Sequence, residues 1–397
     1  MKHRKVYLDG AANTPLDKKV LKAMLPYMTE KSVGNSHAIH ADGIRVMEAV
    51  ERARQRVANS LHVKPAEVYF TSGATESNNW VLESLAIFYD NPYRKEIVMS
   101  SIEHSSVLNT VPALEKLGYT VRFVDPDKNG KILLRDVKKV VSNKTLLVCI
   151  MAVNNETGVR NNINYIGEYA HKCGAWMMSD CTQAFSYGDG YMNLKMFPNV
   201  DYFTFAGHKI YGPAGVGCLI ARKPKPLYPL LAGGSQENGV RGGTHNVAGI
   251  VGLGKACELL ATSNHQSFYE NLYNQVMAGI KDINARYGKL ITLTAEPTCK
   301  NIMNLNCSAI TDAPDFASYL ALYGVECSAG SACDIHQDPE KGPTPSHVLK
   351  AIKVPEDEIS RCVRFSFTKY TTSKDIKYLI EVLTKIASES YNKSTQK

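Results

Sequence analysis

Short apolar runs alternate with longer amphipathic stretches from about residue 50 to residue 221. Seven runs are of strand length, rich in β-branched and aromatic residues, and too continuously apolar for a sheet with one face in water. This alternation predicts a mostly parallel sheet of seven strands with helices on both faces, and ligands at the carboxyl ends of the strands. The runs are EVYFT, EIVMSS, YTVRFVD, TLLVCIMAVN, AWMMSD, DYFTFA and GVGCLIA.

One amphipathic stretch, IRVMEAVERARQRVANSL, shows the helical period best. Its apolar side chains recur every three or four residues, which predicts a helix with one buried face. We expect this face to contain Ile44, Met47, Val50, Ala53, Val57 and Leu61.

The composition turns polar near residues 261–264, and a second, smaller α+β unit is predicted to follow. It begins with a long helix and contains strands near LITLT, NIMNLNC and VRFSFT. We expect residues 16–262 to form a large domain, and residues 1–15 and 263–397 to form a small one. The buried face of its first helix is expected to contain Phe268, Leu272, Val276, Ile280 and Ile283. We expect Thr372 and Asp375 to cap its last helix. The buried face of that helix is expected to contain Ile376, Leu379, Leu383 and Ile386.

Composition excludes several classes of protein. The net charge of +8 is spread without a long Lys/Arg run, so direct nucleic-acid binding is not expected. The start MKHRKVYLDG lacks an apolar signal core, and no window holds about 18 uninterrupted apolar residues, so neither export nor membrane insertion is expected. The ten cysteines show no Cys-x-x-Cys pair or zinc spacing. We therefore expect reduced thiols, no metal site and a cytoplasmic location.

Three segments carry groups that suit one cofactor. In YFTSGATESNN a glycine turn precedes a helix opened by Ala74 and Thr75, whose N–H groups would hold a phosphate, although such a step also occurs for packing alone. It lacks the glycine spacing of dinucleotide or P-loop sites. In AWMMSDCTQ, Asp180 would either cap the next helix or pair with a protonated heterocycle.

The third segment is FTFAGHKIYGPAG, in which Lys209 follows an apolar run about one strand-helix-strand step after Asp180. A surface lysine beside a turn is the ordinary interpretation. A partly desolvated lysine, however, becomes a nucleophile that can form a Schiff base. A phosphate cradle, an aspartate and a lysine in this order are the three groups that bind pyridoxal 5'-phosphate (PLP).

Ten motifs resemble those of cysteine desulfurases, the sulfur-mobilising branch of the class V aminotransferase family. They run in the order of that family over nearly the whole chain. The resemblance implies a PLP-dependent transferase of fold type I, usually a homodimer with its cofactor near the subunit interface. The motifs are YLDGAANTP, FTSGATESNN, EHSSV, VNNETG, DCTQ, GHKIYGP, RGGTHNV, AGSAC, PSHVL and VRFS.

The resemblance also implies roles for single residues. Lys209 would bind the cofactor covalently, and Asp180 would keep its pyridine nitrogen protonated. Gln183 would bond the ring hydroxyl oxygen, with Asn155 near that oxygen and the substrate carboxylate. His104 would stack on the ring and move protons, although a buried structural histidine is the alternative.

The phosphate would lie against Ala74, Thr75 and His208, with Thr244 reaching in from the other subunit. Family members commonly have a serine where this chain has Ala206, so one phosphate hydrogen bond is expected to be missing, which would cost about 1 to 3 kcal/mol. Thr204 is a candidate to compensate.

Arg364 would hold the substrate carboxylate with its planar guanidinium, unless it is a surface arginine at a strand end.

Cys333 in AGSAC is the expected nucleophile, because residues rich in Pro, Asp, Gly and Lys follow it and predict an exposed loop. Cys149 and Cys218 lie in strand-like runs, and the rival Cys327 lies at an expected strand end. The stretch after Cys333 is longer than usual for the family and is stiffened by Pro339, Pro343 and Pro345. The chain also ends soon after Ile386, without the long tail with which some members dock a scaffold, so the acceptor is left open.

The predicted activity is conversion of L-cysteine to L-alanine, with a persulfide formed on Cys333 and passed to an acceptor protein. Iron-sulfur cluster assembly and tRNA thiolation are the candidate pathways. A selenocysteine lyase would share every group, a class V aminotransferase would not need Cys333, and a PLP-fold scaffold without activity is the remaining alternative.

Overall fold

The computed structural model describes residues 4–29, 33–188, 192–222, 224–311, 313–330 and 345–395. Its main sheet has seven strands: β2 (Val68–Thr71), β3 (Glu96–Ser100), β4 (Thr120–Val124), β5 (Thr145–Cys149), β6 (Trp176–Asp180), β7 (Tyr202–Ala206) and β8 (Gly217–Ala221). Their order in the sheet is β2-β8-β7-β6-β5-β3-β4. Only β8 runs antiparallel to its neighbours in this sheet. The predicted mostly parallel sheet is confirmed, and each apolar run supplies one strand.

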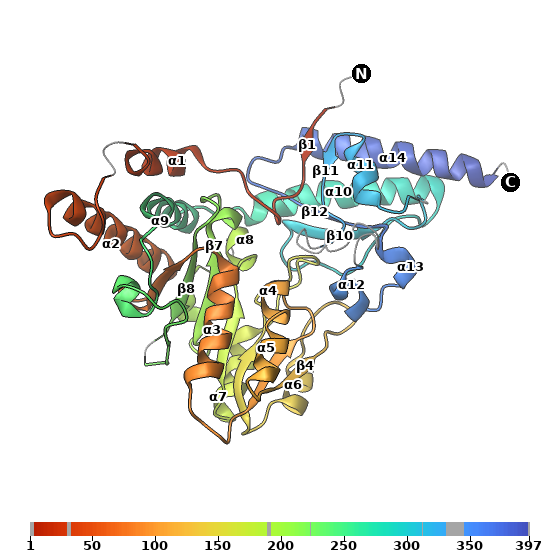
Figure 1. The fold of residues 1–397 in the computed structure, drawn as a ribbon. Coiled ribbons are helices and arrows are strands. Elements are labelled where there is room, and N and C mark those ends of the chain that lie inside the picture. Colours follow the sequence, from red (N-terminus) through yellow and green to blue (C-terminus); the bar gives the residue numbers. More distant parts are fainter. Residues whose placement is uncertain are drawn as a thin grey trace.

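Helices cover both faces of this sheet, as Figure 1 shows. Successive residues of a strand point to opposite faces, so Ile97 and Met99 pack in one core and Val98 in the other. The first core lies under α3 (Ala74–Phe88), α4 (Ser105–Leu108) and α5 (Val111–Lys116), and the second under α2 (Ala41–Leu61), α6 (Leu134–Val140), α7 (Ile163–Lys172) and α9 (Val247–Ala261). Shorter elements are α1 (Lys18–Met24), η1 (Leu25–Tyr27), η3 (Pro65–Glu67), α8 (Ala184–Tyr187), η4 (Leu194–Met196), η5 (Gly207–Lys209) and η6 (Gln236–Gly239).

The carboxyl-terminal part forms two further sheets. The antiparallel order β12-β10-β9 joins β12 (Cys362–Ser366), β10 (Ile302–Asn306) and β9 (Thr292–Leu293), as the apolar runs predict. β1 (Val6–Tyr7) pairs in parallel with β11 (Val325–Glu326), which brings the first described strand of the chain against this part (Figure 1). The division into domains at residues 15/16 and 262/263 stays a prediction. The helices here are α10 (Gln266–Tyr287), α11 (Phe316–Ala321), α12 (His347–Ala351), α13 (Glu356–Ile359) and α14 (Ser373–Thr395).

The two long helices of this part, α10 and α14, pack against each other. At the start of α14 the Thr372 N–H donates to Asp375 Oδ2 (2.8 Å) and the Asp375 N–H donates to Thr372 Oγ1 (3.3 Å), which is the predicted cap. The helix continues to Thr395, well past Ile386. None of the described helices is long and apolar enough to cross a membrane. All the apolar residues predicted to be buried in α10 and α14 are buried, except Phe268, which is half-buried.

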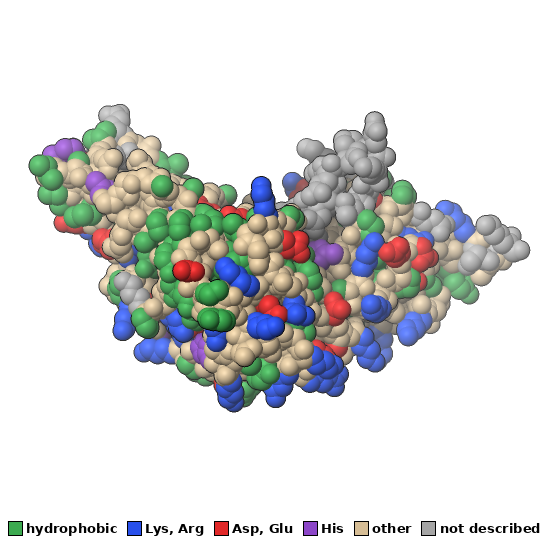
Figure 2. Space-filling model, turned by 60° about the horizontal axis from the view of Figure 1, so that its bottom comes forward, with side chains coloured by type: hydrophobic (Ala, Val, Ile, Leu, Met, Phe, Trp, Pro, Cys, Tyr) green, Lys and Arg blue, Asp and Glu red, His purple; other side chains and the backbone are tan. Residues whose placement is uncertain are grey.

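The predicted buried face of α2 is wrong at its amino-terminal end. Val50 and the later residues of that face are buried, but Ile44 and Met47 are 44% and 45% exposed. Val46 and Ala49 are buried there instead. This end of α2 lies with α1 on an arm that projects from the body of the molecule, and Figure 2 shows apolar and histidine side chains gathered at its tip on the left. Periodicity identified an apolar stripe, but the described residues leave its amino-terminal end exposed.

A buried ion pair fixes the segment around η6 to the large sheet. Glu237 is 3% exposed and accepts hydrogen bonds from both terminal nitrogens of Arg54 (2.8 Å each) and from the Phe70 N–H (2.9 Å). His245 Nε2 lies 3.0 Å from Glu237 Oε1. These partners lower the pKa of Glu237 to about 2, against the raising effect of its burial.

We expect Glu237→Ala to lower the free energy of unfolding by about 3 to 5 kcal/mol, because it removes the buried carboxylate from the Arg54 guanidinium and leaves it only the exposed Glu51. Denaturant unfolding near neutral pH measures this loss. The control is Glu48→Ala, which breaks an exposed pair with Arg52 (3.2 Å) and should change stability by less than about 1 kcal/mol. Equal effects of the two substitutions would contradict the structural role of Glu237.

Candidate active site

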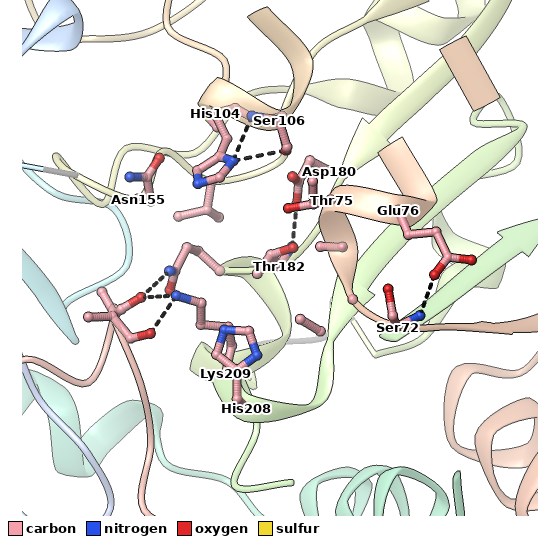
Figure 3. A pocket seen from close by; sticks show the side chains of 18 of the residues that line it. Ser72, Thr75, Glu76, His104, Ser106, Asn155, Asp180, Thr182, His208 and Lys209 are labelled. Carbon is pink, nitrogen blue, oxygen red and sulfur yellow. Dashed lines mark hydrogen bonds between the residues drawn. The ribbon is translucent and has the colours of Figure 1, made fainter. Parts of the chain in front are cut away.

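A cavity of about 350 Å³ opens at the carboxyl ends of the central strands. Figure 3 shows its polar side chains converging from several elements. It includes every predicted cofactor or substrate residue within the described part of the chain except Thr244. Those residues are Ala74, Thr75, His104, Asn155, Asp180, Gln183, His208, Lys209 and Arg364.

Lys209 lies at the end of η5, directly after β7, and its side chain reaches across the cavity (Figure 3). Its Nζ donates to the carbonyl oxygens of Ala11 (2.6 Å) and Ala12 (2.7 Å). Thr14 holds the same turn from outside, since its N–H and its hydroxyl both donate to the His208 carbonyl (2.9 and 2.8 Å). The amine therefore points into the site and away from bulk solvent.

Asp180 ends β6, and β6 pairs in parallel with β7 so that Asp180 lies opposite Thr204. The carboxylate is 6% exposed. Its Oδ1 accepts from the Thr182 N–H (2.9 Å), and its Oδ2 accepts from Asn78 Nδ2 (2.8 Å). Asp180 thus caps the turn that follows it but not helix α8, whose N-cap is Gln183. It lines the cavity, and its pairing with a protonated heterocycle stays a prediction.

The amino terminus of α3 forms one wall of the cavity. Helix geometry leaves the N–H groups of Ala74 and Thr75 without acceptors inside the helix, and the helix dipole makes this end positive. The approach is tight, because a Cβ on Gly217 of β8 would lie 2.6 Å from the Gly73 Cα. A glycine at 217 is what lets the strand and the loop before α3 meet.

His104 caps α4, and its ring lies on the opposite side of the cavity from His208 (Figure 3). Its Nδ1 accepts from the Ser106 N–H (3.1 Å) and lies 2.9 Å from Ser106 Oγ. His208 is half-buried, and its burial together with the neighbouring Lys209 lowers its pKa to about 4. His208 is therefore neutral at pH 7 and presents one N–H donor.

Gln183 binds to the segment that also holds the lysine. Its Nε2 donates to the Ala11 carbonyl at 2.9 Å, and its side chain is 6% exposed. Ala206 lines the cavity where a serine would add a hydroxyl. Thr204 does not compensate for this, because it is fully buried and its hydroxyl donates to Asn78 Oδ1 (2.5 Å).

Arg364 is 1% exposed, so it is not a surface arginine. Its Nη2 forms an ion pair with Asp9 Oδ1 (2.8 Å), and its Nη1 donates to the Asn155 carbonyl (3.1 Å). Its Nε is buried and has no hydrogen-bond partner among the described residues. The guanidinium is therefore fixed in the cavity wall, and its Nε–H is a buried donor that a ligand could use.

Thr244 is exposed, and it lies apart from the cavity of its own chain. Arg241, in the same motif, forms a bidentate ion pair with Glu76 at the start of α3 (2.8 and 3.0 Å). This pair ties the RGGTHNV segment to the helix that forms the cavity wall.

Cys333, Pro339 and Pro343 lie outside the described residues. Cys327 follows β11, as expected, and its burial and the nearby Asp9 raise the pKa of its thiol well above the usual range. A thiol of that kind is a poor nucleophile. Cys149 and Cys218 are fully buried in β5 and β8, as predicted.

Sequence reasoning assigned no role to two polar residues of the site. Asn78 contacts Asp180, and Asp9 contacts Arg364. Asn78 could have been noticed, because it shares a helical face with the apolar Val81, Leu82 and Leu85, where an amide needs hydrogen-bond partners. Asp9 lies in the motif YLDGAANTP, but nothing local to that motif indicates Arg364 as its partner.

Comparison with known proteins matches this arrangement to one family. Aminotransferase class-V matches residues 6–379. The chain belongs to the class-V aminotransferase family. Its relatives include "Cysteine desulfurase IscS" of Dictyoglomus turgidum, 38% identical over 384 residues, which cover 96% of this chain and 94% of the relative. The protein of the same name from Methanosarcina thermophila is 36% identical over 395 residues, which cover 99% of this chain and 94% of that protein.

Solved structures also resemble this class-V aminotransferase in fold. A "NifS-like protein" superposes with a TM-score of 0.85 and 31% identity, covering 97% of this chain and all of the other. "SspA in complex with cysteine" superposes with a TM-score of 0.78 and 32% identity, covering 93% and 100%. The chain is therefore a cysteine desulfurase homologue with the fold type I architecture.

Glu103, directly before His104, is a fully buried carboxyl group. Its Oε1 accepts from Ser100 Oγ (2.5 Å) and the Met151 N–H (2.8 Å), while Oε2 has no hydrogen-bond partner among the described residues. Burial raises the pKa of Glu103 from 4.5 to about 8, more than these two donors lower it. The group is therefore protonated and neutral at pH 7.

Folded chains hold the Glu103 proton up to about pH 8, whereas unfolded chains lose it above pH 4.5. The free energy of unfolding should therefore fall as pH rises between these values. Glu103→Gln imitates the protonated acid, so we expect it to stabilise the chain by about 2 to 4 kcal/mol at about pH 8.5, and by less than about 1 kcal/mol at about pH 5.

Denaturant unfolding of parent and variant at both pH values tests this expectation. The matched control is Glu381→Gln on the exposed face of α14, which should change stability equally at the two pH values. A gain from Glu103→Gln that does not depend on pH would contradict the protonated state of Glu103.

Proposed function

We propose that this class-V aminotransferase homologue is a PLP-dependent cysteine desulfurase that converts L-cysteine to L-alanine and transfers the sulfur to Cys333. The observation that carries the proposal is that Lys209 and Asp180 line one cavity from neighbouring parallel strands. A lysine amine and a buried carboxylate in one cavity, beside a helix amino terminus, are the groups that PLP requires.

The other residues of the cavity also fit PLP. The first turn of α3 offers N–H donors to a phosphate, and Thr182 Oγ1 is buried without a hydrogen-bond partner among the described residues, so it is available to a ligand. Gln183 and Asn155 would bind the ring oxygen, and His104 would pack on the ring. When bound, PLP supplies a protonated ring that takes up the electron pair released at the substrate Cα.

Arg364 and Asn155 would bind the substrate carboxylate. The guanidinium is held by Asp9 and by the Asn155 carbonyl, and its Nε–H has no hydrogen-bond partner among the described residues. Binding at this point would place the substrate Cα on the side of the cavity that Lys209 reaches. Lys209 Nζ would then take the Cα proton, and His104 would assist in moving it.

Cys333 would act as the nucleophile toward the substrate sulfur. Its thiolate forms an S–S bond as the C–S bond of the substrate breaks, and protons from the two thiol groups and from Cα are redistributed to give alanine and a persulfide. No external oxidant is needed, since the substrate carbon is reduced as the sulfur is transferred. Cys327 is disfavoured for this role by the raised pKa of its thiol.

The residues on either side of segment 331–344 support this assignment. Gly330 lies against the Glu156 carboxylate, where an added Cβ would be 3.4 Å from Oε2, and Ser346 Oγ donates to the same oxygen at 2.6 Å. Glu156 adjoins Asn155 of the cavity. The described chain on both sides of Cys333 therefore lies against Glu156, next to the cavity residue Asn155.

We also propose that the protein works as a homodimer. The uncovered apolar end of α2 borders a groove of about 490 Å³ that His245, the neighbour of Thr244, helps to line. A second copy seated there would cover Ile44 and Met47 and would bring its own site toward Thr244. The nine described cysteines are free thiols, which suits a reducing cytoplasmic compartment.

The sulfur would leave Cys333 for an acceptor protein that serves iron-sulfur cluster assembly or tRNA thiolation. A persulfide-transfer assay with purified acceptors of both kinds decides between these pathways.

Two substitutions test the proposed function. Protein purified with PLP should absorb at about 420 nm, and Lys209→Ala should lose this band. Cys333→Ala should keep the band. Its rate of sulfide release from L-cysteine in the presence of dithiothreitol should fall at least about 100-fold, because the nucleophile is gone. The control Cys173→Ala, at a half-buried thiol that ends α7 and does not line the cavity, should behave as the parent.

Each result separates one alternative. Protein without the band would be a scaffold, and a band with amino-group transfer but no sulfide would indicate an aminotransferase. A much higher rate with selenocysteine than with cysteine would indicate a selenocysteine lyase. Parent-like sulfide release by Cys333→Ala would overturn the assignment of the nucleophile.

We expect Ala206→Ser to strengthen PLP binding by about 1 kcal/mol, or roughly fivefold in Kd, by adding a hydroxyl donor to the cavity wall. Titration of apoprotein with PLP, followed by fluorescence, measures the change. The control is Ala221→Ser on β8, which is buried away from the cavity and should leave the Kd unchanged. Weaker binding by Ala206→Ser would show that the position excludes a hydroxyl.

A further inference from the structure

A fully buried amide, Asn78, connects the two sides of the active-site cavity. Its Nδ2 donates to Asp180 Oδ2 and to Ser106 Oγ, both at 2.8 Å. Ser106 Oγ lies 2.9 Å from His104 Nδ1. One side chain therefore contacts the carboxylate and, through a single hydroxyl, the histidine.

Thr204 sets the direction of this network. It is fully buried in β7, and its hydroxyl donates to Asn78 Oδ1 at 2.5 Å. The amide oxygen must therefore face Thr204, and both N–H groups face Asp180 and Ser106. A flipped amide would set its oxygen against the Asp180 carboxylate, which accepts and cannot donate when ionised.

The same accounting fixes the proton on His104. Ser106 Oγ accepts from Asn78, so its own hydrogen is available to donate to His104 Nδ1. The Ser106 backbone N–H donates to the same nitrogen at 3.1 Å. This backbone N–H can only donate, so Nδ1 is an acceptor, and the proton of a neutral ring must be on Nε2.

We propose that Asn78 is a positioning residue that orients Asp180 and His104 together, and that Thr204 fixes the direction of the network. This inference rests on the proposed function, because it assigns Asp180 and His104 to PLP. It also divides the proton transfers: a neutral His104 ring would donate from Nε2, so Lys209 Nζ would be the acceptor for the Cα proton. Through a buried network of this kind, an effect at one end is felt at the other.

Thr204→Val tests the proposal, because it removes the hydroxyl and keeps the shape of the side chain. We expect it to raise the Kd of the apoprotein for PLP about tenfold. Thr204→Ser keeps the hydroxyl and should stay within about threefold of the parent. The matched control Thr145→Val removes a buried hydroxyl from β5 that accepts the Ser142 N–H, and should leave the Kd unchanged.

Two further measurements respond to the network and not to packing alone. In a double-mutant cycle, Thr204→Val and Ser106→Ala should change the Kd by clearly less together than the product of their separate effects, because both act through Asn78. In apoprotein labelled with ¹⁵N-histidine, the His104 resonances, assigned by their loss in His104→Gln, should show the proton on Nε2.

The possible failures are distinguishable. A parent chain without absorbance at about 420 nm after loading with PLP would overturn the proposed function. A parent with the band, but with independent effects of Thr204→Val and Ser106→Ala or with the His104 proton on Nδ1, would overturn this inference alone. If Thr204→Val does not fold, the ¹⁵N measurement on the parent still decides.

Discussion

The geometry of the site depends on hydrogen bonds that the segment 8–17 makes to both parts of the molecule. Its Gly10 N–H donates to the Ser366 carbonyl of β12 (3.0 Å), and its Thr14 N–H donates to the His208 carbonyl (2.9 Å). The carbonyls of Ala11 and Ala12, between these two anchors, accept from Lys209 Nζ. The segment thus spans from the small antiparallel sheet to the end of β7. The position of the lysine amine is set by residues nearly two hundred positions away in the sequence.

The sequence predicted the large sheet well, because the physical signal there is strong. Strands buried on both faces must be continuously apolar, and helices covered on one face must repeat their apolar residues every three or four positions. Those constraints located all seven strands and the buried faces of α10 and α14. The same constraints predicted wrongly that Ile44 and Met47 are buried, because periodicity shows that a helix face is apolar but does not show what packs against it.

The order of the motifs also predicted which residues meet at the cavity, because strands that are neighbours in a parallel sheet bring their carboxyl ends to one edge. It did not predict the partners behind the cavity wall. Thr204 was a candidate to form a hydrogen bond with a phosphate. Its hydroxyl instead donates to Asn78 Oδ1 on helix α3, which packs on the sheet. Pairings of this kind depend on the distance between elements after packing, which no local pattern contains.

Arg364 and Asp9 together carry no net charge, and this has a consequence for what the cavity accepts. An amino acid in its zwitterionic form adds no net charge when its carboxylate joins the pair and its ammonium group enters the cavity. A substrate with a second carboxylate would leave one negative charge uncompensated in a place with little water, at a cost of several kcal/mol. If the proposed substrate carboxylate binds to Arg364, the ion pair in the wall would therefore act as an electroneutrality filter against amino acids with a second carboxylate.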